Sequence, residues 1–274
     1  MNRALLESHS EGVATLTLNR PASLNAMNGE MLESLLDSLP RLAADRNVRA
    51  VVVTGAGQAF CAGGDMGNFD NPKAKRAQDI ATASRREFNV ESLAHGLRNT
   101  ARVSELLYNM PKPTLAVLPG VAAGAGLSLA LACDLRIAAD NVRLTTAFSR
   151  IGLSGDMGGS FFLTQLVGAA KARELYFLSP KLMATDALAL GLLNRVVSAE
   201  MLQETANELA LSLARLPTIA TGYIKKNLNM AQTRTLAEVL DMESLHMIRG
   251  MMTRDHREGV LAFMEQRTPH FSGR

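Results

Sequence analysis

Two hydrophobic runs, AVVVT at residues 50–54 and TLAVL at residues 114–118, each lead into a stretch of very small residues. The first run is followed by AFCAGGD at residues 59–65, and the second is followed by GVAAGAG at residues 120–126. Short apolar runs of this kind are typical of buried strands. The small side chains that follow leave backbone N–H groups uncovered, so a substrate oxygen can approach them closely. Two such amides aimed at one point would form an oxyanion hole, which stabilises charge that develops on a carbonyl oxygen.

The composition is that of a soluble globular enzyme with a large core. Of the 274 residues, 47% are hydrophobic and 20% are charged, and the formal net charge is only +3. No dense Lys/Arg run occurs, so we expect no nucleic-acid partner. No stretch approaches the roughly 18 apolar residues that a membrane span needs, so we expect no membrane partner either. The N-terminus lacks the apolar region of a secretion signal.

Cysteine and histidine usage adds two expectations. Cys61 and Cys133 both lie in Ala-rich apolar surroundings, which predicts buried, reduced thiols and a cytoplasmic protein. The histidines have no metal-ligand spacing, so we expect no metal site and interpret them as surface residues. They are His9, His95, His246, His256 and His270.

Periodicity predicts strands and helices that alternate through the first two-thirds of the chain. The last 75 residues or so read as almost purely helical, with Leu202, Ala206, Leu209 and Leu213 on one face. The expected strands are 13–18, 50–54, 114–118, 142–144 and 192–197. The first expected helix is capped by Asn25 or Asn28 and ends before Arg41. The other helices expected before residue 199 cover 85–109, 127–133, 160–166 and 169–178.

The order and spacing of several motifs resemble the crotonase (enoyl-CoA hydratase/isomerase) superfamily over about residues 11–271. The motifs are LNRP at 18–21 with LNAM at 24–27, the two small-residue stretches, ACD at 132–134, IGL at 151–153, GG at 158–159, the segment 184–197, and REG at 257–259 with Ala262 and Phe263.

The resemblance implies an α/β fold built as a spiral of strand-strand-helix (ββα) repeats. It implies a core over residues 1–198 that holds the acyl-CoA site, and a C-terminal helical trimerisation region over residues 199–274. The protein would therefore be a homotrimer or a dimer of trimers. The implied substrate is an acyl-CoA thioester, with CoA present as part of the substrate and no cofactor bound permanently.

The resemblance also assigns residues to the site. The two oxyanion-hole amides fall on Gly64 and on Ala125, where the family more often has glycine. An alanine keeps the N–H group in place provided that its φ is negative. Contacts to the adenine of CoA fall on the backbone near Ala62 and Met66, and Phe263, with Arg267, is expected to contact CoA from a neighbouring subunit.

The two glutamates used by hydratases of this family are missing, because their positions hold Ser128 and Phe148. Water addition needs one group to activate water and another to deliver a proton, so the usual hydratase mechanism is not expected. The family's dehalogenases use a histidine and a tryptophan at positions that hold Ala101 and Phe148, so dehalogenation is not expected either.

One carboxylate, Asp156, lies where the aspartate-dependent isomerases of the family have theirs. A single base suits a 1,3-proton shift, and the apolar neighbours Phe148 and Met157 are expected to raise its pKa by desolvation. The competing interpretation is that Asp156 caps the helix that follows. Asp65 and Asp134 also lie in family motifs, but each follows small residues at a turn, and we interpret both as structural.

Two alternatives to the isomerase remain open. A hydratase or thioester hydrolase could recruit water through Asp156 alone. A non-catalytic acyl-CoA-binding member of the fold would bind the thioester without turning it over.

Overall fold

The computed structural model describes residues 3–65 and 89–274. The larger sheet in this part of the chain has six strands in the order β1-β2-β3-β5-β7-β10. β1 and β2 are antiparallel, and every other neighbouring pair is parallel. β3 and β5 are the two hydrophobic runs, and they lie side by side with Val51 opposite Thr114. The strands are β1 (Leu5–Ser10), β2 (Val13–Leu18), β3 (Ala50–Gly55), β5 (Thr114–Leu118), β7 (Leu135–Ala139) and β10 (Arg195–Val197).

A smaller sheet has the order β4-β6-β8-β9. Its strands are β4 (Ala59–Cys61), β6 (Val121–Ala123), β8 (Arg143–Thr145) and β9 (Leu182–Met183). The consecutive pairs β3/β4, β5/β6 and β7/β8 each place their first strand in the large sheet and their second in the small one. Each pair therefore advances both sheets by one position, which confirms the predicted α/β spiral of ββα repeats.

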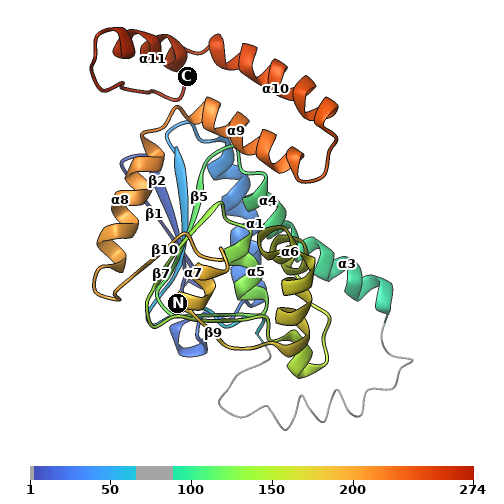
Figure 1. The fold of residues 1–274 in the computed structure, drawn as a ribbon. Helices are drawn as coiled ribbons and strands as arrows, with labels where there is room; N and C mark the ends of the chain where they lie inside the picture. The colour runs from blue at the N-terminus through green and yellow to red at the C-terminus, as the bar shows by residue number, and fades with distance from the viewer. Residues whose placement is uncertain (1–2, 66–88) are drawn as a thin grey trace.

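Helices cover the sheets and fill the core between them (Figure 1). Asn28 caps α1 through its side chain, which accepts a hydrogen bond from the Met31 amide, as predicted for one of two asparagines. The helices are α1 (Gly29–Ala44), α3 (Val90–Thr100), α4 (Arg102–Tyr108), α5 (Ala125–Leu131), α6 (Gly159–Leu178), α7 (Ala184–Ala189), α8 (Leu202–Ala214), α9 (Thr218–Ala231), α10 (Leu236–Met251) and α11 (Arg254–Met264), with short 3-10 turns η1 (Pro21–Ser23) and η2 (Phe148–Ile151).

The C-terminal helices divide into two groups. α8 packs on the large sheet and contributes Leu202 and Ala206 to the main core. α9, α10 and α11 lie beyond one end of the sheets (Figure 1). The division of the chain at residues 198 and 199 stays a prediction.

Three of the differences from the sequence-based expectation have a clear physical reason. β1 was not expected, because LLESHS shows no apolar alternation; it forms by hairpin pairing with β2 through Glu11 and Gly12, both at positive φ. α1 continues through Arg41 to Ala44 despite Pro40, because Leu42 is fully buried. The single helix expected over 85–109 is two helices that meet at Ala101, and residues 85–88 lie outside the described residues.

The thiols and one histidine complete the comparison. Cys61 and Cys133 are buried and free, as predicted, and burial raises the pKa of Cys61 to about 11 and that of Cys133 to about 12. The interpretation of the histidines as surface residues is wrong for His246, which is 2% exposed and stacks on Tyr223 with ring centroids 4.5 Å apart. Its burial and the nearby charges of Lys226 and Arg249 lower its pKa.

Candidate functional site

The two small-residue stretches pack directly against each other. β4 and β6 pair in parallel, with Cys61 opposite Ala122. A Cβ atom added to Gly126 would lie 2.2 Å from the Cys61 carbonyl oxygen, and one added to Gly120 would lie 1.9 Å from the Gln58 carbonyl oxygen. Any side chain at these two positions would push the strands apart. These two positions therefore require glycine, because only a residue without a side chain lets the two backbones approach so closely.

The backbone at Gly63 and Gly64 lies next to the start of α5. A Cβ atom on Gly63, whose φ is +109°, would lie 3.1 Å from the Ala123 carbonyl oxygen and 3.7 Å from the Ala125 nitrogen. A one-residue bridge pairs Gly64 with Met27: the Met27 amide donates to Gly63 O, and the Asp65 amide donates to Met27 O. In such a bridge the amide of the bridged residue points away from the partner strand. The Gly64 N–H therefore faces away from Met27.

Both candidate amides are available to a ligand. Ala125 is the first residue of α5, where an amide has no intrahelical acceptor, and it is not among the residues with positive φ. The condition placed on an alanine at this position is therefore met. Neither the Gly64 nor the Ala125 N–H donates a hydrogen bond to any residue that the structure describes. Apart from the chain neighbours of Gly64, no heavy atom of the described residues lies within 4 Å of the point where a Gly64 Cβ would be.

Asp156 lies in a strained loop that leads into α6. Gly155 has φ +116°, Met157 has φ +52° and Gly158 has φ +75°. Gly158 is the N-cap residue of α6, and no side chain caps this helix. The interpretation of Asp156 as a helix cap is therefore wrong. Its Oδ1 atom is buried and has no hydrogen-bond partner among the described residues, and burial raises its pKa, in the direction predicted.

The positions that would carry the glutamates of a hydratase lie around the same point. The ring of Phe148 lies 3.7 Å from the place of a Cβ on Gly124, the residue before Ala125. The hydroxyl of Ser128 donates to the Gly124 carbonyl oxygen at 3.3 Å and lies next to Gly159, at the start of α6. Phe148 and Met157 are both buried, and Met157 directly follows Asp156 in the chain.

Sequence reasoning missed Tyr176, which also lies beside Asp156. Burial, together with the charge of Asp156, raises the pKa of Tyr176 to about 12. Tyr176 lies near the C-terminal end of α6, twenty positions after Asp156 in the chain. The only signal in the sequence is the pair Gly155 and Gly159, whose missing side chains leave room for the tyrosine ring.

The remaining candidates, which are the expected contacts to CoA, stay predictions. Ala62 is half-buried, and its amide donates to Leu24 O. Met66 lies outside the described residues. Phe263 is on α11 and 84% exposed, at the end of the molecule away from α5 (Figure 1). Arg267 forms ion pairs with Glu258 and Glu265, both at 2.6 Å.

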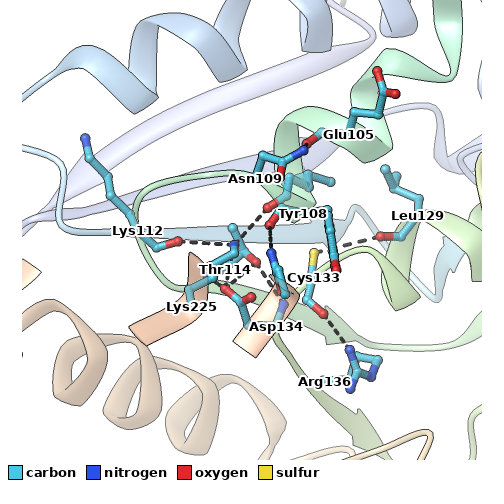
Figure 2. Close-up of polar contacts among 12 residues, drawn as sticks. Glu105, Tyr108, Asn109, Lys112, Thr114, Leu129, Cys133, Asp134, Arg136 and Lys225 are labelled. Atoms are coloured by element: carbon cyan, nitrogen blue, oxygen red, sulfur yellow. Dashed lines mark hydrogen bonds and ion pairs between the residues drawn. The ribbon is translucent and has the colours of Figure 1, made fainter. Parts of the chain in front are cut away.

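Asp65 and Asp134 have the structural role predicted for them. Asp65 forms an ion pair with Arg20 at 2.8 Å. Asp134 Oδ2 accepts hydrogen bonds from the amide and hydroxyl of Thr114, at 2.7 and 2.9 Å, and from Lys225 Nζ at 2.9 Å. Figure 2 shows this junction between β5, the end of α5 and α9. These carboxylates fasten loops and helices to the sheet.

Two cavities lie on another side of the molecule. Their volumes are about 1230 and 370 Å³, and both are lined by Tyr108 and Lys225, with none of Gly64, Ala125 or Asp156 in either wall. Within residues 3–65 and 89–274, no group of His, Cys, Asp and Glu side chains has the arrangement of a metal site. No helix in the same ranges is long and apolar enough to span a membrane.

Comparison with known proteins adds a family and several relatives. The family model described as enoyl-CoA hydratase/isomerase matches residues 8–274. The chain is 38% identical to a 1,2-epoxyphenylacetyl-CoA isomerase of Escherichia coli, over the full length of both. It is 33% identical to a 4-chlorobenzoyl coenzyme A dehalogenase of an Arthrobacter species, over 88% of this chain and 83% of the relative. The crystal structure of a putative enoyl-CoA hydratase from Streptomyces coelicolor superposes with a TM-score of 0.89 at 35% identity, covering 99% of this chain and 95% of that one.

Proposed function

Because the chain belongs to the enoyl-CoA hydratase/isomerase family, we propose that it is an acyl-CoA isomerase, which shifts a double bond or rearranges a ring through an enolate. Its substrate is an acyl-CoA thioester, and CoA arrives as part of that substrate. The observation that supports the proposal is that Asp156 is the one carboxylate assigned to the site among the described residues, while Ser128 and Phe148 hold the positions that the family resemblance gives to the two hydratase glutamates.

The proposed reaction conserves every atom of the substrate. The Asp156 carboxylate removes a proton from carbon, and the electron pair moves into the thioester carbonyl. The N–H groups of Gly64 and Ala125 stabilise the resulting oxyanion. The protonated Asp156 then returns the proton to a different carbon. The raised pKa of Asp156 suits this role, because a base is most effective when its pKa approaches the working pH.

A panel of CoA thioesters tests the proposal. Linear 3-enoyl-, 2-enoyl- and ring-epoxide-CoA substrates are incubated with the wild-type protein, Asp156→Asn and Asp140→Asn, and products are separated by chromatography. We expect an isomer from the wild type and from Asp140→Asn, whose carboxylate is on an exposed turn. Asp156→Asn should bind CoA thioesters normally but lose isomerisation by about a thousandfold or more, since it removes the only proposed acid–base group.

The alternatives predict different products in the same assay. Unchanged turnover of a 3-enoyl-CoA by Asp156→Asn would exclude Asp156 as the base. A product heavier by one water would favour the hydratase, and release of free CoA would favour the hydrolase. Binding without turnover of any thioester would favour the non-catalytic acyl-CoA-binding interpretation.

We further propose that the chain forms a homotrimer or a dimer of trimers through its C-terminal helices. α10 and α11 carry a set of large apolar side chains that are exposed in the single chain, and burial of such surface stabilises association by about 25 cal/mol per Å². The most exposed are Leu236 at 73%, Met247 at 67%, Met252 at 84%, Phe263 at 84% and Met264 at 73%.

The two buried, reduced thiols suit a reducing compartment such as the cytoplasm.

Analytical ultracentrifugation tests the assembly, and Phe263→Ala tests the contact to CoA. We expect a particle of three or six times the chain mass of 29.4 kDa.

If Phe263 of one subunit contacts CoA bound by another, Phe263→Ala should raise KM severalfold while kcat is kept. Phe177→Ala on α6, where the side chain is 71% exposed, is the matched control. A trimeric Phe263→Ala protein with an unchanged KM would contradict the contact.

A further inference from the structure

Tyr176 is held against the Asp156 loop by packing on both sides of the site. Its ring stacks on Phe148, with centroids 6.2 Å apart and an interplanar angle of 6°. Its ring edge lies against Gly155, where an added Cβ would be 3.0 Å from Cε1. A side chain at Gly155 would press on the tyrosine ring more tightly than an ordinary van der Waals contact allows. The loop that carries Asp156 is therefore shaped to accept this ring.

The kink in α6 is what brings Tyr176 back to the loop. Tyr176 is seventeen residues after Gly159, so in a straight helix the two would be about 25 Å apart along the axis. Gly168, with φ +75° and ψ +162°, interrupts the helix. As a result the Tyr176 hydroxyl lies only 2.5 Å from the place of a Cβ on Gly159.

The last turn of α6 is also fastened to the loop that carries Phe148. Ser179, which ends the helix, shares hydrogen bonds with the hydroxyls of Thr146 and Ser149, both at 2.9 Å. Thr146 also donates to Leu175 O at 2.8 Å. These bonds fix the position of Tyr176 relative to Asp156.

Two hydroxyl groups meet above Gly159. Ser128 Oγ lies 2.2 Å and the Tyr176 hydroxyl 2.5 Å from the place of a Cβ on this glycine. Hydrogen bonding to Ser128 lowers the pKa of Tyr176, but burial and the Asp156 charge outweigh it, so the phenol stays protonated at neutral pH. It is therefore a hydrogen-bond donor in the working range of an enzyme.

Asp156 lacks such a donor in the structure. Its buried Oδ1 atom has no partner among the described residues, and a buried carboxylate without a hydrogen bond is costly to ionise. Among those residues, Tyr176 of α6 is the titratable group on which the Asp156 charge acts, and Ser128 of α5 and Phe148 of η2 bring no charge.

We propose that Tyr176 is a positioning residue of this site, whose hydroxyl, supported by Ser128, donates a hydrogen bond to the Asp156 carboxylate when that group is ionised. The inference rests on the proposed function, because it assigns Asp156 the role of base. In the ionised state, the Ser128 hydroxyl turns from the Gly124 carbonyl oxygen to donate to Tyr176, and Tyr176 donates to Asp156. After Asp156 has taken the substrate proton, the carboxyl group needs the donor less, and the tyrosine hydroxyl turns to Ser128.

Tyr176→Phe is the direct test, because it keeps the ring that packs on Phe148 and Gly155 and removes only the hydroxyl. Loss of a donor to a carboxylate should raise the Asp156 pKa by about one unit. The acid limb of the pH profile of kcat/KM should therefore move up by about one pH unit. Ser128→Ala should move it in the same direction by less, and Tyr223→Phe, on α9, should leave it unchanged.

A second measurement is independent of catalysis. Titration of the free protein labelled with ¹³C at the Asp carboxyl carbon, with Asp156→Asn to assign the signal, gives the Asp156 pKa directly in the wild type and in Tyr176→Phe. If the proposed isomerase activity is absent but this pKa rises in Tyr176→Phe, the inference stands and only the function fails. An Asp156 pKa that is the same in both folded proteins would overturn the inference, and so would an unmoved acid limb in an active variant.

Discussion

Asp134 and Asp156 are carboxylates that follow small-residue segments, yet they differ in hydrogen bonding within the folded chain. The Oδ2 atom of Asp134 accepts hydrogen bonds from Thr114 and Lys225 (Figure 2). Around Asp156, a buried carboxylate oxygen and the N–H groups of Gly64 and Ala125 have no partner among the described residues. Folding normally satisfies buried polar groups. The unpaired groups in the segments that carry Gly64, Ala125 and Asp156 are therefore the ones we assign to the substrate, whereas Asp134 and its partners stabilise the fold.

The largest expected difference comes from removing one unpaired donor. Ala125→Pro deletes the N–H at the first position of α5, where proline is compatible with a helix. Because that donor contacts the oxyanion only as charge develops, kcat should fall by about 10²–10³, with little change in stability. Ala125→Gly, which keeps the N–H, should retain activity. Steady-state kinetics of a 3-enoyl-CoA substrate checks both, and equal activity of the proline and glycine variants would remove Ala125 from the hole.

Removing a paired group should have the opposite signature. Asp134→Asn leaves Lys225 buried without its counter-ion, and breaking a buried pair typically costs about 3 kcal/mol of unfolding free energy. The folded variant should keep the wild-type kcat at low temperature, because Asp134 does not reach the site. Urea unfolding and kinetics on the same preparation test this. A stable but inactive Asp134→Asn protein would show that the two regions are not separate in function.

The smallest expected effect is on the pH dependence of stability, which should differ between the wild type and Asp156→Asn. Burial raises the folded-state pKa of Asp156 above its unfolded value of 3.8, so the folded state binds the proton more tightly. The stability that this gives is fully present below the unfolded pKa and is lost as the pH rises through the folded pKa. Asp156→Asn cannot ionise, so its stability relative to the wild type should increase over that pH range. Thermal unfolding at a series of pH values measures the difference. A stability of Asp156→Asn relative to the wild type that stays constant or falls as the pH rises would contradict the burial argument.

The sequence predicted the parts of the fold and site that depend on local patterns. The runs at 50–54 and 114–118 are β3 and β5 because short apolar runs between small residues favour buried strands, and the two helices expected at 160–166 and 169–178 are the halves of α6 on either side of Gly168. The burial of Cys61 and Cys133 followed from their apolar neighbours. The positions of Gly64, Ala125 and Asp156 came from the family resemblance, which no local pattern could replace.

The parts that failed depend on contacts between distant segments. β1 forms only because β2 offers it an edge, and His246 is buried only because α9 and α10 pack together. Tyr176 meets Asp156 through the direction of the kink at Gly168 and the approach of η2, neither of which its own neighbours encode. Residue types along the chain cannot predict such contacts, because they depend on how distant segments pack in the folded protein.

Isotope incorporation tests the central claim most directly. The wild-type protein is incubated with a 3-enoyl-CoA in D₂O, and the product is analysed by mass spectrometry. If Asp156 removes and returns a proton within an enolate mechanism, the product will be an isomer of the substrate with no water added. It will carry deuterium wherever the Asp156 carboxyl group exchanges its proton with solvent before returning it, and Asp156→Asn will incorporate none. A product that has gained D₂O as a whole, or deuterium incorporation that persists in Asp156→Asn, would contradict the account.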